Sequence, residues 1–222
     1  MTFRTLMLRG LIAAALLGVS LPVHAAPSAL TAHQLAQRVD NHYNHLHSLR
    51  AGFTQSYQGL GMSRSESGAL LLRKPGRMRW DYSSPAGKLF LLDGKFAWSY
   101  TPGDPAVHRI PVGNLSDLRT PLRFLLGHTQ LEREIEHLRI APAANGEYAL
   151  AGQPKGQQRS ISLLTLTVTA QGVITGIQID QTDGSVTRFT FTGEVPNAPA
   201  PPGDFRFTPP SGIPVVSEQS PE

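Results

Sequence analysis

The chain has 222 residues, of which 40% are hydrophobic and 16% charged, and it contains no cysteine. This length and composition are typical of one globular domain, or of two small ones. The missing cysteine excludes a disulfide framework, a thiolate metal site, a cysteine nucleophile and an N-terminal lipidated cysteine that would anchor the protein itself.

Residues 1–25 have the pattern of a Sec-type signal peptide. Two arginines precede an apolar run from Leu11 to Leu21, and Val23-His24-Ala25 follows as a cleavage signal. The run is shorter than the roughly 18 apolar residues of a membrane span. We therefore expect export and one soluble domain over residues 26–222. Losing the two arginines reduces a net charge that is only +4, which leaves no basic field to recruit nucleic acid.

The mature N-terminus has helical periodicity. Thr31 and Gln34 have capping-box spacing, and Gly52 is the expected end of the helix. The apolar stripe consists of Leu35, Val39, Tyr43, Leu46 and Leu49. A second, short helix is predicted over residues 120–127, with threonine as N-cap, proline at the first helical position and glycine after the last turn.

Most of the remaining chain alternates between apolar and polar residues, which predicts about ten or eleven strands joined mainly as a meander. Hairpin turns are indicated by Asp93-Gly94, Asn145-Gly146, Gln171-Gly172 and Asp183-Gly184. Residues 131–140 suit either a helix or the start of a strand, and the sequence leaves the choice open.

Residues typical of catalysis are nearly absent. The sequence has no Gly-x-Ser-x-Gly elbow, no phosphate-binding glycine loop and no His-Glu-x-x-His, and no cofactor is implied. His42, His45 and His47 lie close together, but the only acidic residue near them in sequence is Asp40 and there is no cysteine, so we interpret them as surface histidines rather than a metal site.

The stretch from Arg73 to Arg79 carries four cations in seven residues. Two interpretations have about equal weight: a solvated outer face, or an edge that docks a partner or a lipid headgroup.

Large aromatic side chains recur on two predicted strands. Met78, Trp80 and Tyr82 share one face of the first strand, and Phe96, Trp98 and Tyr100 share one face of the second. We expect the two sets to lie on the same side of the sheet. They form either a filled core or the wall of an apolar cavity, with the first helix, through Leu35 and Val39, and the 120–127 helix as its lid. Composition does not choose between these alternatives.

Eight segments of the chain resemble the outer-membrane lipoprotein carrier (LolA) family in order and approximate spacing. They are Phe53-Thr54-Gln55, Gly68 through Arg73-Lys74-Pro75, Met78-Arg79-Trp80, Pro85, Leu91 to Lys95, Trp98 to Pro102, Thr120-Pro121 and Phe205 to Gly212. The resemblance covers nearly the whole mature chain.

The resemblance implies a mainly β protein with covering helices, an unclosed antiparallel β-barrel (half-barrel) with a helical lid. Its apolar cavity would hold lipoprotein acyl chains during transit through the periplasm. The implied partners are acylated lipoproteins, an inner-membrane lipoprotein-releasing ABC transporter and an outer-membrane acceptor. No reaction is catalysed, and we expect a monomer.

The family also implies roles for particular residues. The basic residue before the motif proline holds the lid by bonding to its backbone; here it is Lys74 where the family usually has arginine, with Arg73 beside it. Trp80, Phe90 and Met78 fall at cavity positions. The lid-helix positions are Leu122, Phe124 and Leu125. We expect Phe124→Glu to lower cargo binding more than it lowers folding stability.

Three other functions fit parts of the pattern. A half-barrel can carry free lipid or glycolipid instead of lipoprotein, and related half-barrels serve as periplasmic regulators of envelope stress. The membrane-anchored acceptor of the same pathway has the same fold, but the missing cysteine argues against it.

Overall fold

The computed structural model describes residues 30–112 and 130–217. Two α-helices are present in these ranges, α1 (Ala32–Asn44) and the single-turn α2 (Leu131–Glu134), together with two short 3₁₀ turns, η3 (Ala144–Gly146) and η4 (Pro202–Phe205). The predicted signal peptide and the predicted helix 120–127, with Leu122, Phe124 and Leu125, lie outside the described residues.

The described strands form one twelve-stranded sheet in the order β12-β6-β5-β4-β3-β2-β1-β11-β10-β9-β8-β7. Their bounds are β1 Ser48–Gly59, β2 Met62–Arg73, β3 Arg77–Ser84, β4 Leu89–Leu92, β5 Phe96–Tyr100, β6 Val107–Pro111, β7 Ile135–Pro142, β8 Tyr148–Pro154, β9 Ile161–Val168, β10 Ile174–Gln181, β11 Val186–Pro196 and β12 Val215–Ser217.

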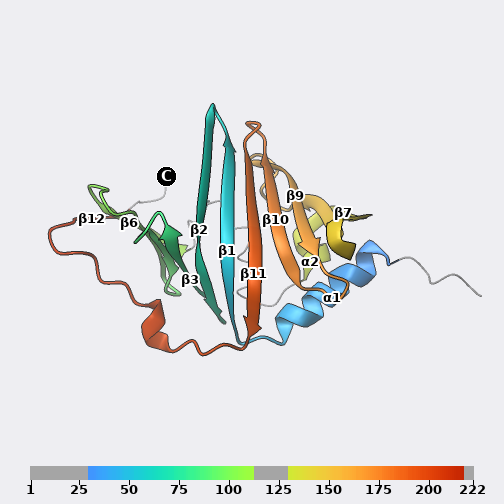
Figure 1. Cartoon of the computed structure of the whole chain (residues 1–222), viewed down its shortest axis with the longest axis horizontal. Helices are drawn as coiled ribbons and strands as arrows, with labels where there is room; N and C mark the ends of the chain where they lie inside the picture. The colour runs from blue at the N-terminus through green and yellow to red at the C-terminus, as the bar shows by residue number, and fades with distance from the viewer. Residues whose placement is uncertain (1–29, 113–129, 218–222) are drawn as a thin grey trace, which may run out of the picture.

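The sheet is an unclosed barrel, as predicted. Its edge strands are β12 and β7, which do not pair with each other, while β1 and β11 pair near the middle and bring the two halves of the chain together. All pairs are antiparallel except β12 with β6, which is parallel. Figure 1 shows α1 lying across the β7–β10 half of the sheet and the C-terminal segment running from β11 to the opposite edge.

The four predicted hairpin turns are confirmed, because Gly94, Gly146, Gly172 and Gly184 all have positive φ between consecutive strands. The undecided stretch 131–140 contains both elements, a helical turn to Glu134 and then β7.

The predicted C-terminal end of the first helix is wrong, although its start is confirmed by a complete capping box between Thr31 and Gln34. The helix ends at Asn44, not near Gly52. Residues 41–45 are Asn, His and Tyr, which are weak helix formers. Beyond them Ser48–Gly59 forms backbone ladders with both β2 and β11, and this pairing outweighs continuation of the helix. Leu46 and Leu49 are nevertheless buried.

Candidate functional site: the concave face under helix α1

The concave face of the sheet carries an aromatic cluster centred on Trp80, whose side chain is fully buried. Its ring meets that of Phe53 edge to face at 4.5 Å, and those of Phe189 and Phe191 lie at 5.5 and 6.3 Å. These residues come from β3, β1 and β11, which the pairing order places near the centre of the sheet. Met78 and Phe90 are buried in the same apolar cluster. The predicted positions Met78, Trp80 and Phe90 therefore lie together on one face.

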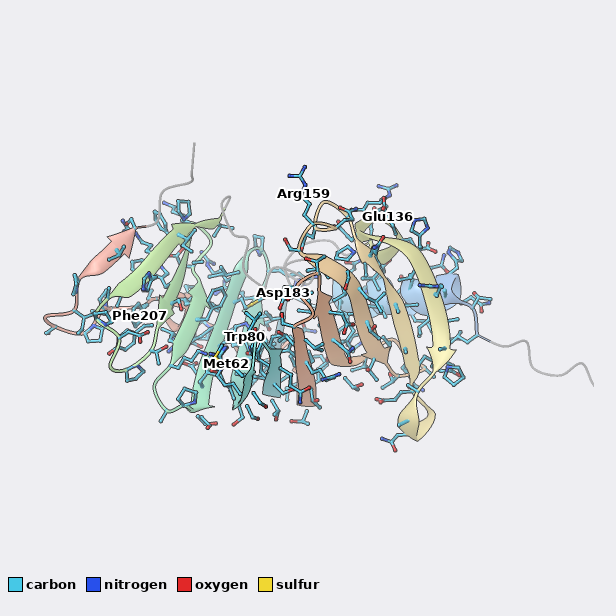
Figure 2. The ribbon with its side chains drawn as sticks, turned by 90° about the horizontal axis from the view of Figure 1, so that it is seen from above. Met62, Trp80, Glu136, Arg159, Asp183 and Phe207 are labelled. Atoms are coloured by element: carbon cyan, nitrogen blue, oxygen red, sulfur yellow. The ribbon has the colours of Figure 1, made fainter. Side chains whose placement is uncertain are left out.

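Helix α1 covers this apolar cluster with one side. Leu35, Val39 and Tyr43 are spaced at four residues, so they lie on one face of the helix, and all are buried in the same cluster as Trp80. Figure 2 shows α1 on one side of the sheet, behind the orange strands, with Trp80 near the middle of the molecule. The structure thus places Leu35 and Val39 where the sequence predicted them, between helix and sheet.

Polar contacts hold the C-terminal end of α1 to the sheet. Lys74 Nζ donates a hydrogen bond to the main-chain oxygen of Tyr43 at 2.6 Å, which places a cation at the negative end of the helix dipole. The Tyr43 hydroxyl donates to Glu194 Oε2 at 3.1 Å and accepts from the Ile174 N–H at 3.0 Å. His42 Nε2 lies 2.6 Å from the other Glu194 carboxylate oxygen. Glu194 on β11 therefore ties two helix residues to the sheet.

Burial changes the acid–base behaviour of two of these groups. The pKa of the Tyr43 phenol is raised well above its usual range, first by desolvation and second by the neighbouring Glu194 charge. The hydroxyl therefore stays protonated and donates a hydrogen bond to the Glu194 carboxylate. Desolvation lowers the pKa of the Lys74 ammonium.

The middle of α1 is held by the β9–β10 turn and by the first residue of α2. Arg38 Nη1 donates to the main-chain oxygen of Ala170 at 2.6 Å, and the Asp40 carboxylate accepts the Leu131 N–H at 3.1 Å. Gly172, in the β9–β10 turn, lets the helix come close: a Cβ at this position would lie 2.5 Å from the Arg38 carbonyl carbon. The helix backbone rests directly on this turn.

Little empty space separates the C-terminal end of α1 from β1 and β2. Two voids there, both bordered by Tyr43 and Leu49, have volumes of about 10 Å³ each. A void of this size holds about one water molecule. A bulky ligand enters this part of the concave face only if α1 moves away from the sheet.

Two buried polar atoms on the concave face have no hydrogen-bond partner among the described residues: Trp80 Nε1 and Thr187 Oγ1. An unsatisfied buried donor costs about 1–3 kcal/mol. Such groups need an explanation, and one explanation is a bound molecule that supplies the missing acceptor.

The two basic residues before the motif proline point to different places. Lys74 contacts α1, whereas Arg73 Nη1 donates to the main-chain oxygen of Ala200 at 2.8 Å, in the segment after β11. Of the two candidates for a contact with the lid, only Lys74 bonds to α1. Neighbouring strand residues face opposite sides of a sheet, which is why only one of the pair reaches the helix.

The expectation that Phe96 and Trp98 face the same side as Trp80 is wrong. Trp80 pairs with Phe90, whereas Trp98 pairs with Leu91, the next residue along β4. Because alternate residues of a strand face opposite sides, β5 presents its aromatic residues to the convex face. There Trp98 packs against Leu91 and Phe205, and its ring lies 6.0 Å from that of Phe207.

In the convex cluster, by contrast, the polar side-chain atoms of Trp98 and Asp93 are hydrogen-bonded. Trp98 Nε1 donates to Asp93 Oδ2 at 2.8 Å, and Asp93 Oδ1 accepts the N–H groups of Lys95 and Phe96 at 2.7 Å. A groove of about 690 Å³ opens between this turn and the C-terminal segment, but Arg77, Lys95 and Arg206 are among its lining residues. This mixed polar lining does not suit an acyl chain.

Sequence reasoning missed Glu194 and Gly172, which fix the helix. Glu194 lies more than 150 residues from His42, so no local spacing links the two. Gln171-Gly172 is predictable as a turn, but the helix resting on it leaves no trace in the sequence. In the part of the chain that the structure describes, no three acidic or histidine side chains converge to hold a metal ion. Neither α1 nor α2 has the length and hydropathy of a membrane span.

The fold and this site define an unclosed β half-barrel whose apolar concave face is covered by a helix. A family model for the outer membrane lipoprotein carrier protein LolA matches residues 44–208. The chain therefore belongs to the LolA family.

Curated relatives agree with this assignment. An outer-membrane lipoprotein carrier protein from Chromobacterium violaceum is 31% identical over 170 residues, covering 77% of this chain and 81% of the relative. A protein of the same name from Nitrosospira multiformis is 30% identical, covering 77% and 83%.

A solved structure has a similar fold at low sequence identity. An uncharacterized conserved protein from Thermus thermophilus superposes with a TM-score of 0.53 at 13% identity, covering 84% of this chain and 99% of that one.

Proposed function

We propose that this protein carries acylated lipoproteins through the periplasm, with their acyl chains held on the concave face between α1 and the sheet. The observation that carries the proposal is the Trp80 cluster, an aromatic surface on an open sheet that helix α1 covers among the described residues. The cavity residues of the proposal are Leu35, Val39, Met78, Trp80 and Phe90 from the described residues, with Leu122, Phe124 and Leu125 of the predicted lid helix.

The energetics of the task match such a surface. An acyl chain gains about 0.8 kcal/mol per buried methylene, so removing a chain of about sixteen carbons from a membrane costs on the order of 10 kcal/mol. A carrier must offset most of this cost with apolar contact. The closed concave face has a competing occupant, the apolar side of α1, which returns to the sheet when the cargo leaves. This competition keeps the net affinity low enough for release.

The polar contacts of α1 hold the helix against the sheet when no cargo is bound. In the proposal, Lys74, Glu194 and Arg38 hold the empty protein closed through their contacts to α1 and the β9–β10 turn. The orphaned Trp80 N–H would then find an acceptor in an ester or amide carbonyl at the head of the cargo's acyl chains.

The proposal includes a route. Residues 1–25 direct export, the protein takes lipoprotein from an inner-membrane ABC transporter, and it delivers the cargo to an outer-membrane acceptor without catalysing a reaction. It acts as a monomer and binds no nucleic acid.

Two experiments test the route and the cargo. Depletion should leave lipoproteins in the inner membrane, and normal outer-membrane sorting in the depleted strain would contradict the route. Mass spectrometry of molecules that co-purify with the exported protein should find diacylated or triacylated polypeptides. Free lipid or glycolipid in their place would contradict the cargo assignment and keep only the fold.

A further inference from the structure

The β1–β2 hairpin ends in two exposed apolar side chains. Leu60 is 73% exposed and Met62 is 62% exposed, which makes them the most exposed large hydrophobic residues of the described ranges. Gly59 pairs directly with Met62, so Leu60 and Gly61 form a two-residue turn between them. Neither Leu60 nor Met62 belongs to the apolar cluster on either face of the sheet.

The turn conformation also disfavours leucine. Leu60 has φ 51° and Gly61 has φ 76°, and a two-residue turn with both angles positive favours Asn, Asp or Gly at its first position. The four hairpin turns predicted from the sequence follow that preference or place a polar residue there, with Asp93, Asn145, Gln171 and Asp183 before their glycines. Leu60 therefore gains nothing from the fold, either by burial or by backbone conformation, and a function outside the fold is the remaining explanation.

Among the described residues, the tip of the β1–β2 hairpin projects beyond the neighbouring strand β3. Pairing of β2 with β3 begins only at Ser67, so residues 62–66 extend beyond β3. Figure 1 shows the β1–β2 hairpin reaching farther than the neighbouring strands at this end.

The charge around the tip favours an anionic surface. Residues 57–65 contain no acidic side chain, and Arg64, with 60% of its side chain exposed, carries their one positive charge. On the neighbouring strand, Arg188 lies beside Gln58 of the same hairpin. Glu66, the nearest carboxylate in the hairpin, is buried and paired with Lys88 at 2.6 Å and with Arg64 at 3.4 Å. Asp183 is exposed in the adjoining β10–β11 turn, so these acidic and basic side chains together leave one net positive charge at this end of the sheet.

We infer that Leu60 and Met62 form an apolar tip that inserts transiently into the interfacial layer of a membrane containing anionic lipids, with Arg64 and Arg188 contacting the headgroups. Apolar side chains flanked by cations are the composition that binds this layer. Even one myristoyl chain gives only marginal, reversible membrane binding, so two side chains give a short contact. The inference is independent of the proposed cargo, because it concerns the empty protein and a bare lipid surface.

The cysteine-free sequence allows a direct test. Leu60→Cys, labelled with the environment-sensitive dye NBD, is mixed with vesicles of 70% phosphatidylethanolamine and 30% phosphatidylglycerol. The matched control is Ala144→Cys in the β7–β8 turn, at the other end of the strands, carrying the same dye. The protein is purified after cleavage of its N-terminal segment, checked by mass, because the apolar run from Leu11 to Leu21 would bind vesicles by itself.

We expect the NBD emission at position 60 to shift to the blue and brighten with these vesicles, and the emission at position 144 to stay unchanged. No shift at position 60, or equal shifts at both positions, would overturn the inference. The same holds if position 60 responds only to vesicles that contain a membrane protein, since the partner would then be protein rather than lipid.

A label-free variant separates binding from folding. Leu60→Asn combined with Met62→Ser creates the favoured Asn-Gly turn, so the melting temperature should be equal or higher. Flotation with the same vesicles should fall about tenfold or more, because two inserted apolar side chains are lost. Unchanged flotation of this folded variant would contradict the proposal.

Discussion

On the concave face Trp80 lies under a helix, and on the convex face Trp98 lies under the extended C-terminal segment. Trp98 donates its N–H to Asp93, whereas Trp80 Nε1 has no partner among the described residues. The two covers are alike in other respects. Phe205 and Phe207 of the C-terminal segment pack into the convex cluster, and Leu35, Val39 and Tyr43 of α1 pack into the concave one. Each cover also accepts a main-chain hydrogen bond from a basic side chain, so the unpaired N–H of Trp80 is what distinguishes the two faces.

In the proposed function, this difference distinguishes a structural cluster around Trp98 from a binding surface around Trp80. A buried cluster whose polar atoms are all paired gains nothing from a ligand, and this describes the surroundings of Trp98 and Asp93. The Trp80 cluster, which keeps an unpaired donor under α1, is less stable than it needs to be. Functional sites often carry such a local cost.

The largest expected effect concerns the β9–β10 turn, which contacts the backbone of α1. Gly172→Ala places a Cβ 2.5 Å from the Arg38 backbone and also strains a residue with φ 94°. We expect the free energy of unfolding to fall by about 3 kcal/mol, measured by chemical denaturation, because clash and strain add. The control is Gly184→Ala, also at positive φ but with open space around it, which should cost about 1 kcal/mol. Equal losses would show that α1 does not rest on this turn.

The next effect contrasts the two tryptophans. Trp98→Phe removes a hydrogen bond to a carboxylate and should lower the free energy of unfolding by about 2 kcal/mol, with cargo binding unchanged. Trp80→Phe leaves a cavity where the larger ring was, but it also removes an unpaired buried donor. These two effects oppose each other, so the folding stability should change less while cargo binding falls. Denaturation and co-purification of lipoprotein measure the two quantities. A stability loss at Trp80 as large as that at Trp98, with full cargo binding, would reverse the assignment of the two faces.

A smaller effect concerns the contact at the helix end. Lys74→Met removes the hydrogen bond to Tyr43 and should cost about 1 kcal/mol. It should also speed hydrogen exchange in α1, measured by mass spectrometry, because the closed helix is less firmly held. Arg73→Met is the matched control on the convex face and should leave exchange in α1 unchanged. Faster exchange in both variants would show a general loosening instead of a lid contact.

The smallest expected effect is a loss of stability of the convex cluster in acid. Burial raises the pKa of Asp93, but hydrogen bonds from Phe96, Trp98 and Lys95 outweigh it and hold the pKa below the usual 3.8. Its contribution to stability is therefore complete above the unfolded-state value and is lost as the pH falls through the lower folded-state value.

Comparison with Asp93→Asn should show this dependence. The difference in unfolding free energy between wild type and variant should be constant above about pH 5 and should shrink below pH 3.8. Asp104→Asn, in the β5–β6 loop, is the control. A difference that persists unchanged in acid would mean that the Asp93 charge does not stabilise the cluster.

Much of the fold could be predicted because its signals are local. Alternation of apolar and polar residues indicated the strands. Four dipeptides ending in glycine indicated turns, and these glycines have positive φ in the structure. The face on which each strand presents its aromatic residues could not be predicted in this way, because it depends on the register across β4. One local signal was available: Leu89–Leu92 is apolar without interruption, which is typical of a strand buried on both faces, so β4 needed a cover on its convex side.

The candidate site could be predicted in part. Trp80, Phe90 and Lys74 could be predicted from motifs that resemble those of the LolA family in order and spacing. The structure places Trp80 and Phe90 in the concave cluster and Lys74 against α1. Glu194 could not be found, since its partners His42 and Tyr43 are distant in sequence and a single glutamate has no characteristic spacing.

The most direct test of the concave face as the cargo site uses two matched positions. Phe191 and Phe207 are both partly buried aromatic residues, the first in the Trp80 cluster and the second in the Trp98 cluster. The photo-crosslinker p-benzoylphenylalanine is introduced at each position in living cells, and adducts are identified by mass spectrometry. Lipoprotein adducts should form from position 191 and not from position 207. Adducts from position 207 alone, or from neither position in cells that export lipoproteins, would contradict the account.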